Sequence, residues 1–233
     1  MRTSTFCYAL TACALALPAQ ALVIDTFTDA FTSPLETDPG GSDVSSSEAG
    51  GAGFLFEERE TALDSPLGAP AFSASVLEID ETSGQLGFSN EPFVTTSFFE
   101  IEYTSSSGED LTDGGLNSIF EFDLSFSDVM TPDSGSLFVI VVDGDTDDSS
   151  VEVFFTGPAT LTVAFSEFDS EVDFSDITSF RFQVALSDVD APDLTFDEIR
   201  TAVPEPATFA AIFAAFVLGV SVLRRRVSRE ARD

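Results

Sequence analysis

Tryptophan, lysine and histidine are missing from this chain, and its two cysteines, Cys7 and Cys13, both lie close to the N-terminus. The remainder therefore lacks the residues that most often serve as general base, Schiff-base amine and thiol nucleophile. It also lacks the His and Cys ligands that zinc prefers, and without cysteines it has no disulfide bond to stabilise it. These absences predict a protein that is not an enzyme and that folds on its apolar core alone.

Positive charge is scarce and unevenly placed. All nine basic residues are arginines, and only Arg59, Arg181 and Arg200 lie between residues 22 and 200. They oppose 38 of the 41 aspartates and glutamates, so this segment has a formal charge of −35. Nucleic acid is excluded as a partner, because binding to phosphates needs cations. An acidic surface of this kind favours solubility or, in a second interpretation, binding of divalent cations.

The N-terminus has the pattern of a secretory signal peptide. Arg2 precedes an apolar stretch that ends in small residues, ahead of a predicted cleavage between Ala21 and Leu22. Residues 1–21 are therefore expected to be removed on export. An alternative is a lipoprotein signal, since the run up to Cys13 resembles a lipobox that would place lipid on that cysteine.

The C-terminus carries an apolar run, residues 207–223, that contains no charge. As a helix rising about 1.5 Å per residue, it is just long enough to cross a bilayer. The motif before the run and the basic residues after it are Val203, Pro204, Glu205 and Pro206, then Arg224, Arg225 and Arg226. Positive charge stays on the cytoplasmic side, so we expect a single-pass membrane protein with its bulk outside the cytoplasm.

This tail resembles the PEP-CTERM sorting domain, in which a Pro-Glu-Pro motif, a hydrophobic helix and an arginine-rich end follow one another. The resemblance covers residues 203–233. It implies recognition by an exosortase, a membrane protease that processes such tails in Gram-negative-type bacteria that make exopolysaccharide. Residues 201–233 would then form a sorting tail, with residues 224–233 cytoplasmic, and processing would leave the protein at the cell surface or in the extracellular matrix.

Short runs in which aromatic and β-branched residues alternate with polar ones predict strands. Residues 120–126 and 180–186 alternate cleanly with period two, and clusters of Gly, Asp, Ser and Pro separate such runs. Further strands are expected at residues 24–31, 72–79, 99–103, 137–142, 151–155, 161–165 and 194–196. The run 137–142 is apolar on both faces, which suits a central strand.

The expected fold is all-β. Several short strands that each have one polar face form a jelly-roll-like antiparallel β-sandwich, here over residues 22–200. The segment 33–53 is rich in Gly, Ser and acidic residues, and is expected to be a mobile loop. Residues 201–203 would then be a short tether between the sandwich and the membrane.

Three segments of this sandwich, residues 165–168, 173–177 and 193–199, are loosely similar to jelly-roll modules that bind carbohydrate. The resemblance implies a sugar-binding face, on which such modules usually stack Trp or Tyr rings. This chain has no Trp, and Tyr103 is its only Tyr beyond the signal peptide. A carbohydrate-binding module would therefore need exposed Phe or Tyr103 gathered on one face.

Three functions fit these observations. The predicted one is a structural or adhesive role, without catalysis, in an exopolysaccharide or cell-envelope matrix. A carbohydrate-binding module for exopolysaccharide is the alternative. A glycoside-acting enzyme would need two carboxylates facing each other in a cleft.

Calcium is the only cofactor that the sequence suggests. Asp143, Asp145 and Asp147 begin like a calcium loop, with acids at alternate positions, but the glycine and the last glutamate of an EF-hand are missing. The same residues suit a hairpin turn, which is the favoured interpretation. Asp197, near the last expected strand, is a second candidate, because related sandwiches often hold a structural calcium there. The favoured role of Asp197 is again structural, as a cap on a strand edge.

Overall fold

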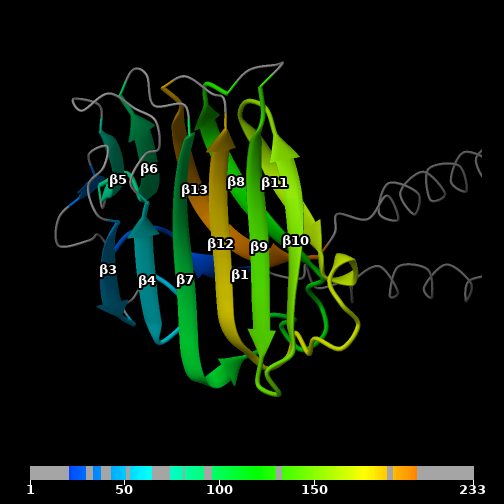
Figure 1. Ribbon diagram of the computed structural model, residues 1–233. Coiled ribbons are helices and arrows are strands. Elements are labelled where there is room, and N and C mark those ends of the chain that lie inside the picture. Colours follow the sequence, from blue (N-terminus) through cyan, green and yellow to red (C-terminus); the bar gives the residue numbers. More distant parts are fainter. Residues whose placement is uncertain are drawn as a thin grey trace, which may run out of the picture. The chain divides into compact units, whose positions relative to one another are not determined.

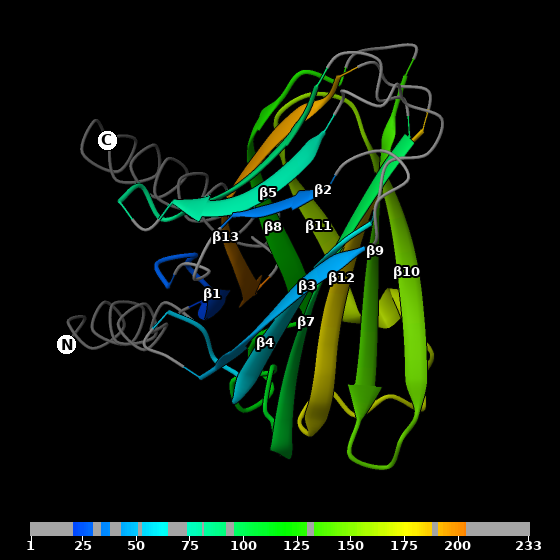
Figure 2. The same cartoon turned by 60° about the vertical axis from the view of Figure 1, so that its left-hand side comes forward.

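A computed structural model describes residues 21–29, 34–37, 43–50, 53–64, 74–80, 82–91, 96–129, 133–187 and 191–203. They form two antiparallel β-sheets packed face to face (Figures 1 and 2). The all-β sandwich expected from the sequence is therefore confirmed. The predicted signal peptide, the motif from Pro204 onward, the apolar run 207–223 and the arginines at 224–226 lie outside the described residues. Within the described ranges, no helix has the length and apolarity to cross a bilayer.

One sheet has seven strands, in the order β11-β8-β13-β6-β5-β2, with β1 also paired to β13. Their bounds are β1 (Leu22–Asp25), β2 (Leu35–Thr37), β5 (Ser75–Asp80), β6 (Gln85–Asn90), β8 (Ile119–Ser127), β11 (Ala159–Ala164) and β13 (Asp193–Ala202). Leu22 of β1 lies opposite Thr201 of β13. The first and last strands are thus neighbours, as closure of the sandwich requires.

The other sheet has six strands, in the order β10-β9-β12-β7-β4-β3. Their bounds are β3 (Val44–Ala49), β4 (Glu58–Leu63), β7 (Thr96–Glu109), β9 (Gly135–Asp143), β10 (Asp148–Phe155) and β12 (Ile177–Ser187). A single 3₁₀ turn, η1 (Phe165–Glu167), follows β11. The predicted central strand at 137–142 does lie inside the sheet, between β10 and β12.

Phenylalanine fills the space between the sheets. Phe120 and Phe122 of β8 meet Phe180 and Phe182 of β12, with ring centroids 5.0 Å apart for Phe120–Phe180 and 5.8 Å for Phe122–Phe182. All four side chains are fully buried. Because successive residues of a strand point to opposite faces, the period-two runs at 120–126 and 180–186 place these rings in the core. A phenylalanine-rich core needs no hydrogen-bond partner, which tryptophan would require.

The expectation of a loop over residues 33–53 was wrong, because β2 and β3 lie within that segment. Strand β3 pairs with β4 from Val44 opposite Leu63 to Ala49 opposite Glu58. It lies at the edge of its sheet, so backbone pairing on one side holds it without an apolar face. Small polar residues therefore suffice, and the composition of the segment hides the strand.

Two expected strand ends are shifted. Strand β1 ends at Asp25 rather than continuing to residue 31, and Phe27 has a left-handed backbone with φ of 51°. Strand β13 continues to Ala202, two residues past the expected end of the sandwich at Arg200. The extension is paired on both sides, since Thr201 lies opposite Leu22 of β1 and Phe120 of β8. Thr201 and Ala202 thus belong to the sandwich and not to a tether.

Candidate functional site

The outer face of the six-stranded sheet, which points away from the seven-stranded sheet, is a continuous surface built from regular strands. Alternation along each strand decides which residues reach it. Its members include Glu58 and Glu60 of β4, Phe98, Glu100 and Glu102 of β7, Arg181, Gln183 and Ala185 of β12, Ser136, Phe138 and Ile140 of β9, and Glu152 and Phe154 of β10. The face thus combines acidic, amide and aromatic side chains.

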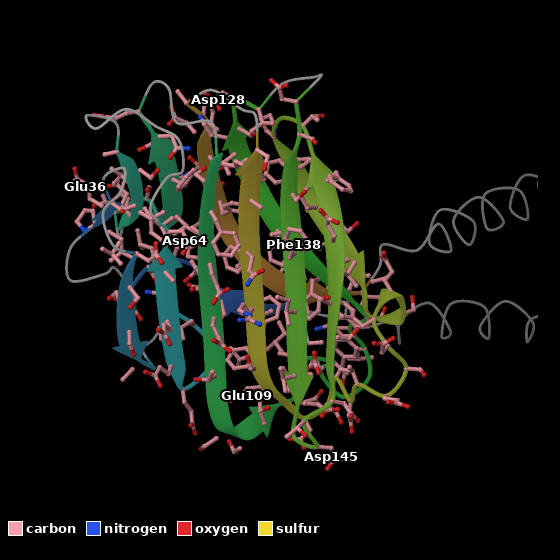
Figure 3. All side chains as sticks on the ribbon, in the orientation of Figure 1. Glu36, Asp64, Glu109, Asp128, Phe138 and Asp145 are labelled. Atoms are coloured by element: carbon pink, nitrogen blue, oxygen red, sulfur yellow. The ribbon has the colours of Figure 1, made fainter. Side chains whose placement is uncertain are left out.

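A hollow of about 470 Å³ lies at one corner of this face. We call it the phenylalanine hollow, and its lining residues are Asp133, Ser134, Ser136, Phe138, Phe154, Ala185 and Ser187. Phe154 is 65% exposed, whereas Phe138, labelled on β9 in Figure 3, is half-buried. Ser136 lies directly opposite both Phe154 and Ala185. The hollow therefore offers aromatic surface bordered by hydroxyl groups.

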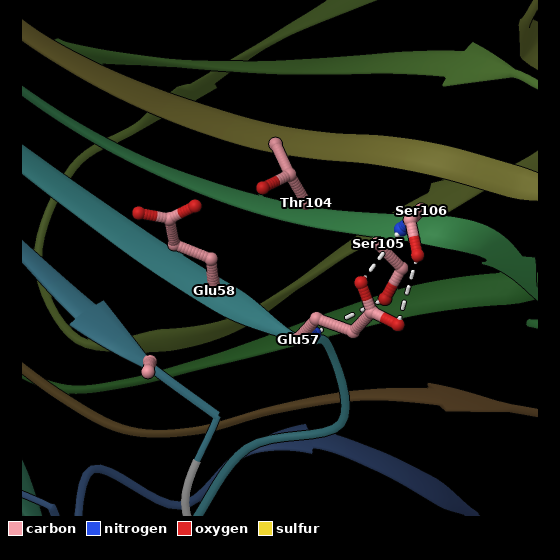
Figure 4. Close-up of a pocket in the computed structure, with 6 residues that line it drawn as sticks. Glu57, Glu58, Thr104, Ser105 and Ser106 are labelled. Carbon is pink, nitrogen blue, oxygen red and sulfur yellow. Dashed lines mark hydrogen bonds between the residues drawn. The ribbon is translucent and has the colours of Figure 1, made fainter.

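A second hollow, of about 550 Å³, involves the start of β4 and the far end of β7. We call it the glutamate hollow, and its lining residues are Ala49, Glu57, Glu58, Thr104, Ser105 and Ser106. The Glu57 carboxylate accepts hydrogen bonds from the backbone N–H of Ser106 at 2.9 Å and from its hydroxyl at 3.1 Å (Figure 4). These two bonds, the backbone one first, lower the pKa of Glu57.

Polar side chains cross-link the strands between the two hollows. Arg181 pairs with Glu100 across 3.6 Å, and the Gln183 amide donates to the same carboxylate. The Ser179 hydroxyl donates to Glu102 at 2.7 Å. Glu60 lies directly opposite Glu102, and like charges in that position destabilise a sheet. The middle of the outer face is thus flat, acidic and already ordered by its own hydrogen bonds.

The candidate calcium loop is a hairpin turn between β9 and β10. Asp143 is buried, and one carboxylate oxygen accepts the backbone N–H groups of Asp145 and Asp147, each at 3.0 Å. Its other oxygen accepts the N–H of Asp173 at 2.9 Å. Asp145 and Asp147 are exposed, with Asp145 at one end of the sandwich (Figure 3). Across the described residues, no three acidic side chains converge as metal ligands. Asp143 therefore has a structural role in the turn.

Asp197 lies within β13 and bridges its neighbours. Its carboxylate accepts from the Gln85 amide of β6 at 2.7 Å and from the Ser125 hydroxyl of β8 at 2.6 Å. The sequence favoured a cap on a strand edge, but β13 lies between β8 and β6, so Asp197 instead cross-links neighbouring strands inside the sheet. Of the sorting motif, only Val203 is among the described residues, directly after β13.

Tyr103 cannot stack on a sugar, because its side chain is fully buried. Its hydroxyl donates to Asp25 at 2.7 Å, and Asp25 also pairs with Arg59 at 2.8 Å. Arg59 in turn pairs with Glu48. Burial raises the pKa of Asp25, against the opposing effects of the Arg59 charge and the Tyr103 hydrogen bond. This network links β1 of one sheet to β4 and β7 of the other.

The sequence contained a signal for Phe154 but none for Phe138. In the run from Val151 to Phe155, period two places Phe154 on the same face as Glu152, which marks that face as outward. Phe138 has only apolar neighbours from Leu137 to Val142, so nothing in that run distinguishes its inner from its outer side.

No known protein family matches this sequence, and no curated protein is significantly similar to it. Solved structures give distant matches. The family 11 carbohydrate-binding module of the cellulosomal cellulase Lic26A-Cel5E of Clostridium thermocellum is 12% identical with a TM-score of 0.39, covering 81% of this chain and 97% of the module. PfGH50B is 11% identical with a TM-score of 0.39 over 57% of this chain. The agarase AgWH50C is 11% identical with a TM-score of 0.38 over 56% of this chain. This chain spans 22% of the length of each of these last two proteins, and similarity at this level carries no argument about function.

Proposed function

We propose that this chain is an exported, exosortase-sorted bacterial matrix protein whose sandwich adheres to neutral polysaccharide through the outer face of the six-stranded sheet. The phenylalanine hollow is the observation that carries the proposal. A pyranose ring presents an apolar face and a rim of hydroxyl groups, and the Phe154 and Phe138 side chains with the bordering serines match both. The carboxylates of the outer face would repel anionic polymers, which favours a neutral ligand.

The positions of the two hollows favour an extended chain over a single sugar. Both open on or beside the outer face, and the register places them at opposite corners. Strands about 4.8 Å apart with a rise of about 3.4 Å per residue put the hollows on the order of 25 Å from each other. A polymer lying obliquely across β12 and β7 would reach both hollows and pass over Gln183 and Glu102.

Binding without hydrolysis is part of the proposal. Glycoside hydrolysis needs two carboxyl groups across the scissile bond, one of which holds its proton through a raised pKa. Among the residues that line the phenylalanine hollow, Asp133 is the only acid. In the glutamate hollow, the hydrogen bonds from Ser106 lower the pKa of Glu57, which is opposite to what a general acid requires.

Two phenylalanine variants test this function. Affinity electrophoresis of residues 22–203 through a panel of neutral polysaccharides should show retardation by at least one of them. Phe154→Ala should weaken that binding about tenfold, or ~1.4 kcal/mol, through loss of the stacking surface. The matched control is Phe126→Ala, because Phe126 is 49% exposed on β8 of the other sheet, and it should change binding less than twofold. Absence of retardation by every polysaccharide, or equal losses in both variants, would overturn the proposal.

A further inference from the structure

Strand β11 is an unusually unprotected sheet edge. Five strands pair with only one other strand: β11, β2 and β1 in one sheet, and β10 and β3 in the other. Four of them carry acidic residues, namely Asp25 in β1, Glu36 in β2, Glu48 in β3, and Asp148 and Glu152 in β10. Strand β11, with the sequence ATLTVA, has no charge and no proline over its six residues. Exposed edges are normally blunted by charge, proline or short length, because they can pair with another chain.

The free backbone groups of β11 can be identified from its hydrogen bonds. The N–H of Phe165, just beyond the strand, donates to Ser118 beside β8 at 2.9 Å, so it points toward β8. The N–H of Ala164 instead donates to the Glu167 side chain at 3.0 Å. Backbone groups alternate along a strand, so Thr160 and Thr162 also point away from β8. Within the described part of the chain, β8 is the only strand that pairs with β11.

We propose that β11 pairs antiparallel with β11 of a second copy of this chain, which joins two seven-stranded sheets across a two-fold axis. Charge argues for this occupant. Between residues 22 and 200 the chain carries 38 acidic residues against three arginines, so two copies repel one another wherever acidic surfaces meet. The uncharged edge strand is where two copies can approach at the lowest electrostatic cost.

The sequence of β11 is also self-complementary. With Leu161 on the two-fold axis, Thr160 lies opposite Thr162 of the other copy, and each such pair exchanges two N–H···O bonds. Threonine opposite threonine is a favourable cross-strand pair. Glu167 is bound at the end of the strand, at the Ala164 N–H, which in this register lies about 20 Å along the strand from the same group of the other copy. The other nearby acids, Glu121 and Asp123, lie on β8, one strand inward. In the dimer they would be about 14 Å from their counterparts, beyond the Debye length of about 8 Å at physiological salt.

Such a dimer does not depend on polysaccharide binding, but it would change what binding achieves. Strand β11 and the outer face belong to different sheets, so the pairing itself uses no residue that lines a phenylalanine hollow. Two hollows on one particle could hold two polysaccharide chains, and this bivalency would turn adhesion into cross-linking.

Sedimentation equilibrium on residues 22–203 in 0.15 M NaCl tests the pairing. The wild type should form dimers that dissociate on dilution, and Thr162→Lys should be monomeric, because it sets two lysines close together across the axis. The matched control is Ser45→Lys on β3, an exposed edge position with the same charge change, which should remain dimeric. Circular dichroism should show the same fold in all three proteins, since residues 45 and 162 are both exposed.

Amide hydrogen exchange locates the interface. The N–H groups of Thr160 and Thr162 should be protected in the wild-type dimer, and that of Thr160 should exchange rapidly in Thr162→Lys. A wild type that stays monomeric up to about 0.1 mM, a range in which specific interfaces associate, would overturn the proposal. So would a dimer that persists in Thr162→Lys with rapid exchange at Thr160.

Discussion

Replacing Arg59 by methionine should destabilise the sandwich more than the loss of either of its other two arginines. The Arg59 and Asp25 side chains are both 0% exposed, and their charged groups lie 2.8 Å apart. In Arg59→Met, Asp25 keeps two donors, the Tyr103 hydroxyl at 2.7 Å and the Phe27 N–H at 2.6 Å, but loses its counter-ion. Removal of one partner from a buried ion pair costs about 3–5 kcal/mol, which is a large share of the ~5–15 kcal/mol that stabilises a typical domain.

The loss should depend on pH with a defined sign. Burial raises the pKa of Asp25, and the Arg59 charge is the largest effect that opposes the rise. Without Arg59, the folded-state pKa should rise further above its unfolded value of about 3.9. A carboxyl with a raised folded pKa destabilises the fold fully above that pKa; the effect declines as the pH falls below it and is gone below the unfolded pKa. The difference in unfolding free energy between wild type and variant should therefore shrink between pH 7 and pH 4.5.

Urea unfolding of both proteins at several pH values measures this difference directly. Arg200→Met is the control, because the Arg200 side chain is 35% exposed and pairs with Glu121 and Glu198 at the surface. Its loss should cost less than about 1 kcal/mol. If Arg59→Met costs as little as Arg200→Met at pH 7, or if its cost does not shrink in acid, then this reasoning about the buried network is wrong.

Two further predictions concern the sorting tail and calcium. Mass spectrometry of protein from the surface of an exosortase-containing cell should show a chain that lacks the C-terminal apolar run. Replacing Pro204 and Glu205 by alanine should leave uncut protein in the membrane. An intact C-terminus on surface protein would refute the processing. Calcium at a few millimolar should raise the melting temperature by about 2–4 °C more than NaCl of equal ionic strength, given a dissociation constant of roughly 10⁻⁴–10⁻³ M and a gain of ~1 kcal/mol. Asp145→Asn combined with Asp147→Asn should abolish the calcium-specific rise in melting temperature. The turn should persist in this variant, because Asp143 accepts the hydrogen bonds that stabilise the turn. A calcium-specific rise that survives both substitutions would exclude this loop as the calcium site.

The strands that the sequence revealed are those with a run of aromatic or aliphatic residues on the inner face. Strands β8 and β12 were predicted because Phe alternates with polar residues along them. In β8 the alternation fails at its end, where a shift in the pairing with β13 leaves Phe126 49% exposed. Strand β6 was missed because only Leu86 and Phe88 mark its inner face, and β3 was missed because an edge strand needs no apolar pattern. Strand β6 pairs with its neighbour β5 and also with the distant β13, whereas β3 pairs only with the next strand, β4. Backbone pairing of this kind leaves no apolar pattern in the sequence of either strand.

The candidate site was only partly visible for a related reason. From the sequence, a carbohydrate-binding face needed exposed Phe side chains or an exposed Tyr103. In the structure Tyr103 is buried and hydrogen-bonded to Asp25, so it is not available to a sugar. It also brings Phe138 and Phe154 together from adjacent strands. Phe154 alternates with Glu152, which marks its face as outward, whereas the run around Phe138 is apolar on both faces. Which side of that run faces solvent depends on strand register and sheet order, and neither can be read from the run itself.

The central claim is that polysaccharide binds the outer face of the six-stranded sheet. Titration of a neutral polysaccharide into ¹⁵N-labelled residues 22–203 tests it most directly, because amide chemical shifts report the contacted strands. The account predicts shifts that centre on Ser136, Phe138, Phe154 and Ala185 and extend toward Gln183, while β5, β6 and β13 stay unchanged. Shifts centred on the seven-stranded sheet, or no shifts with any neutral polysaccharide, would contradict it.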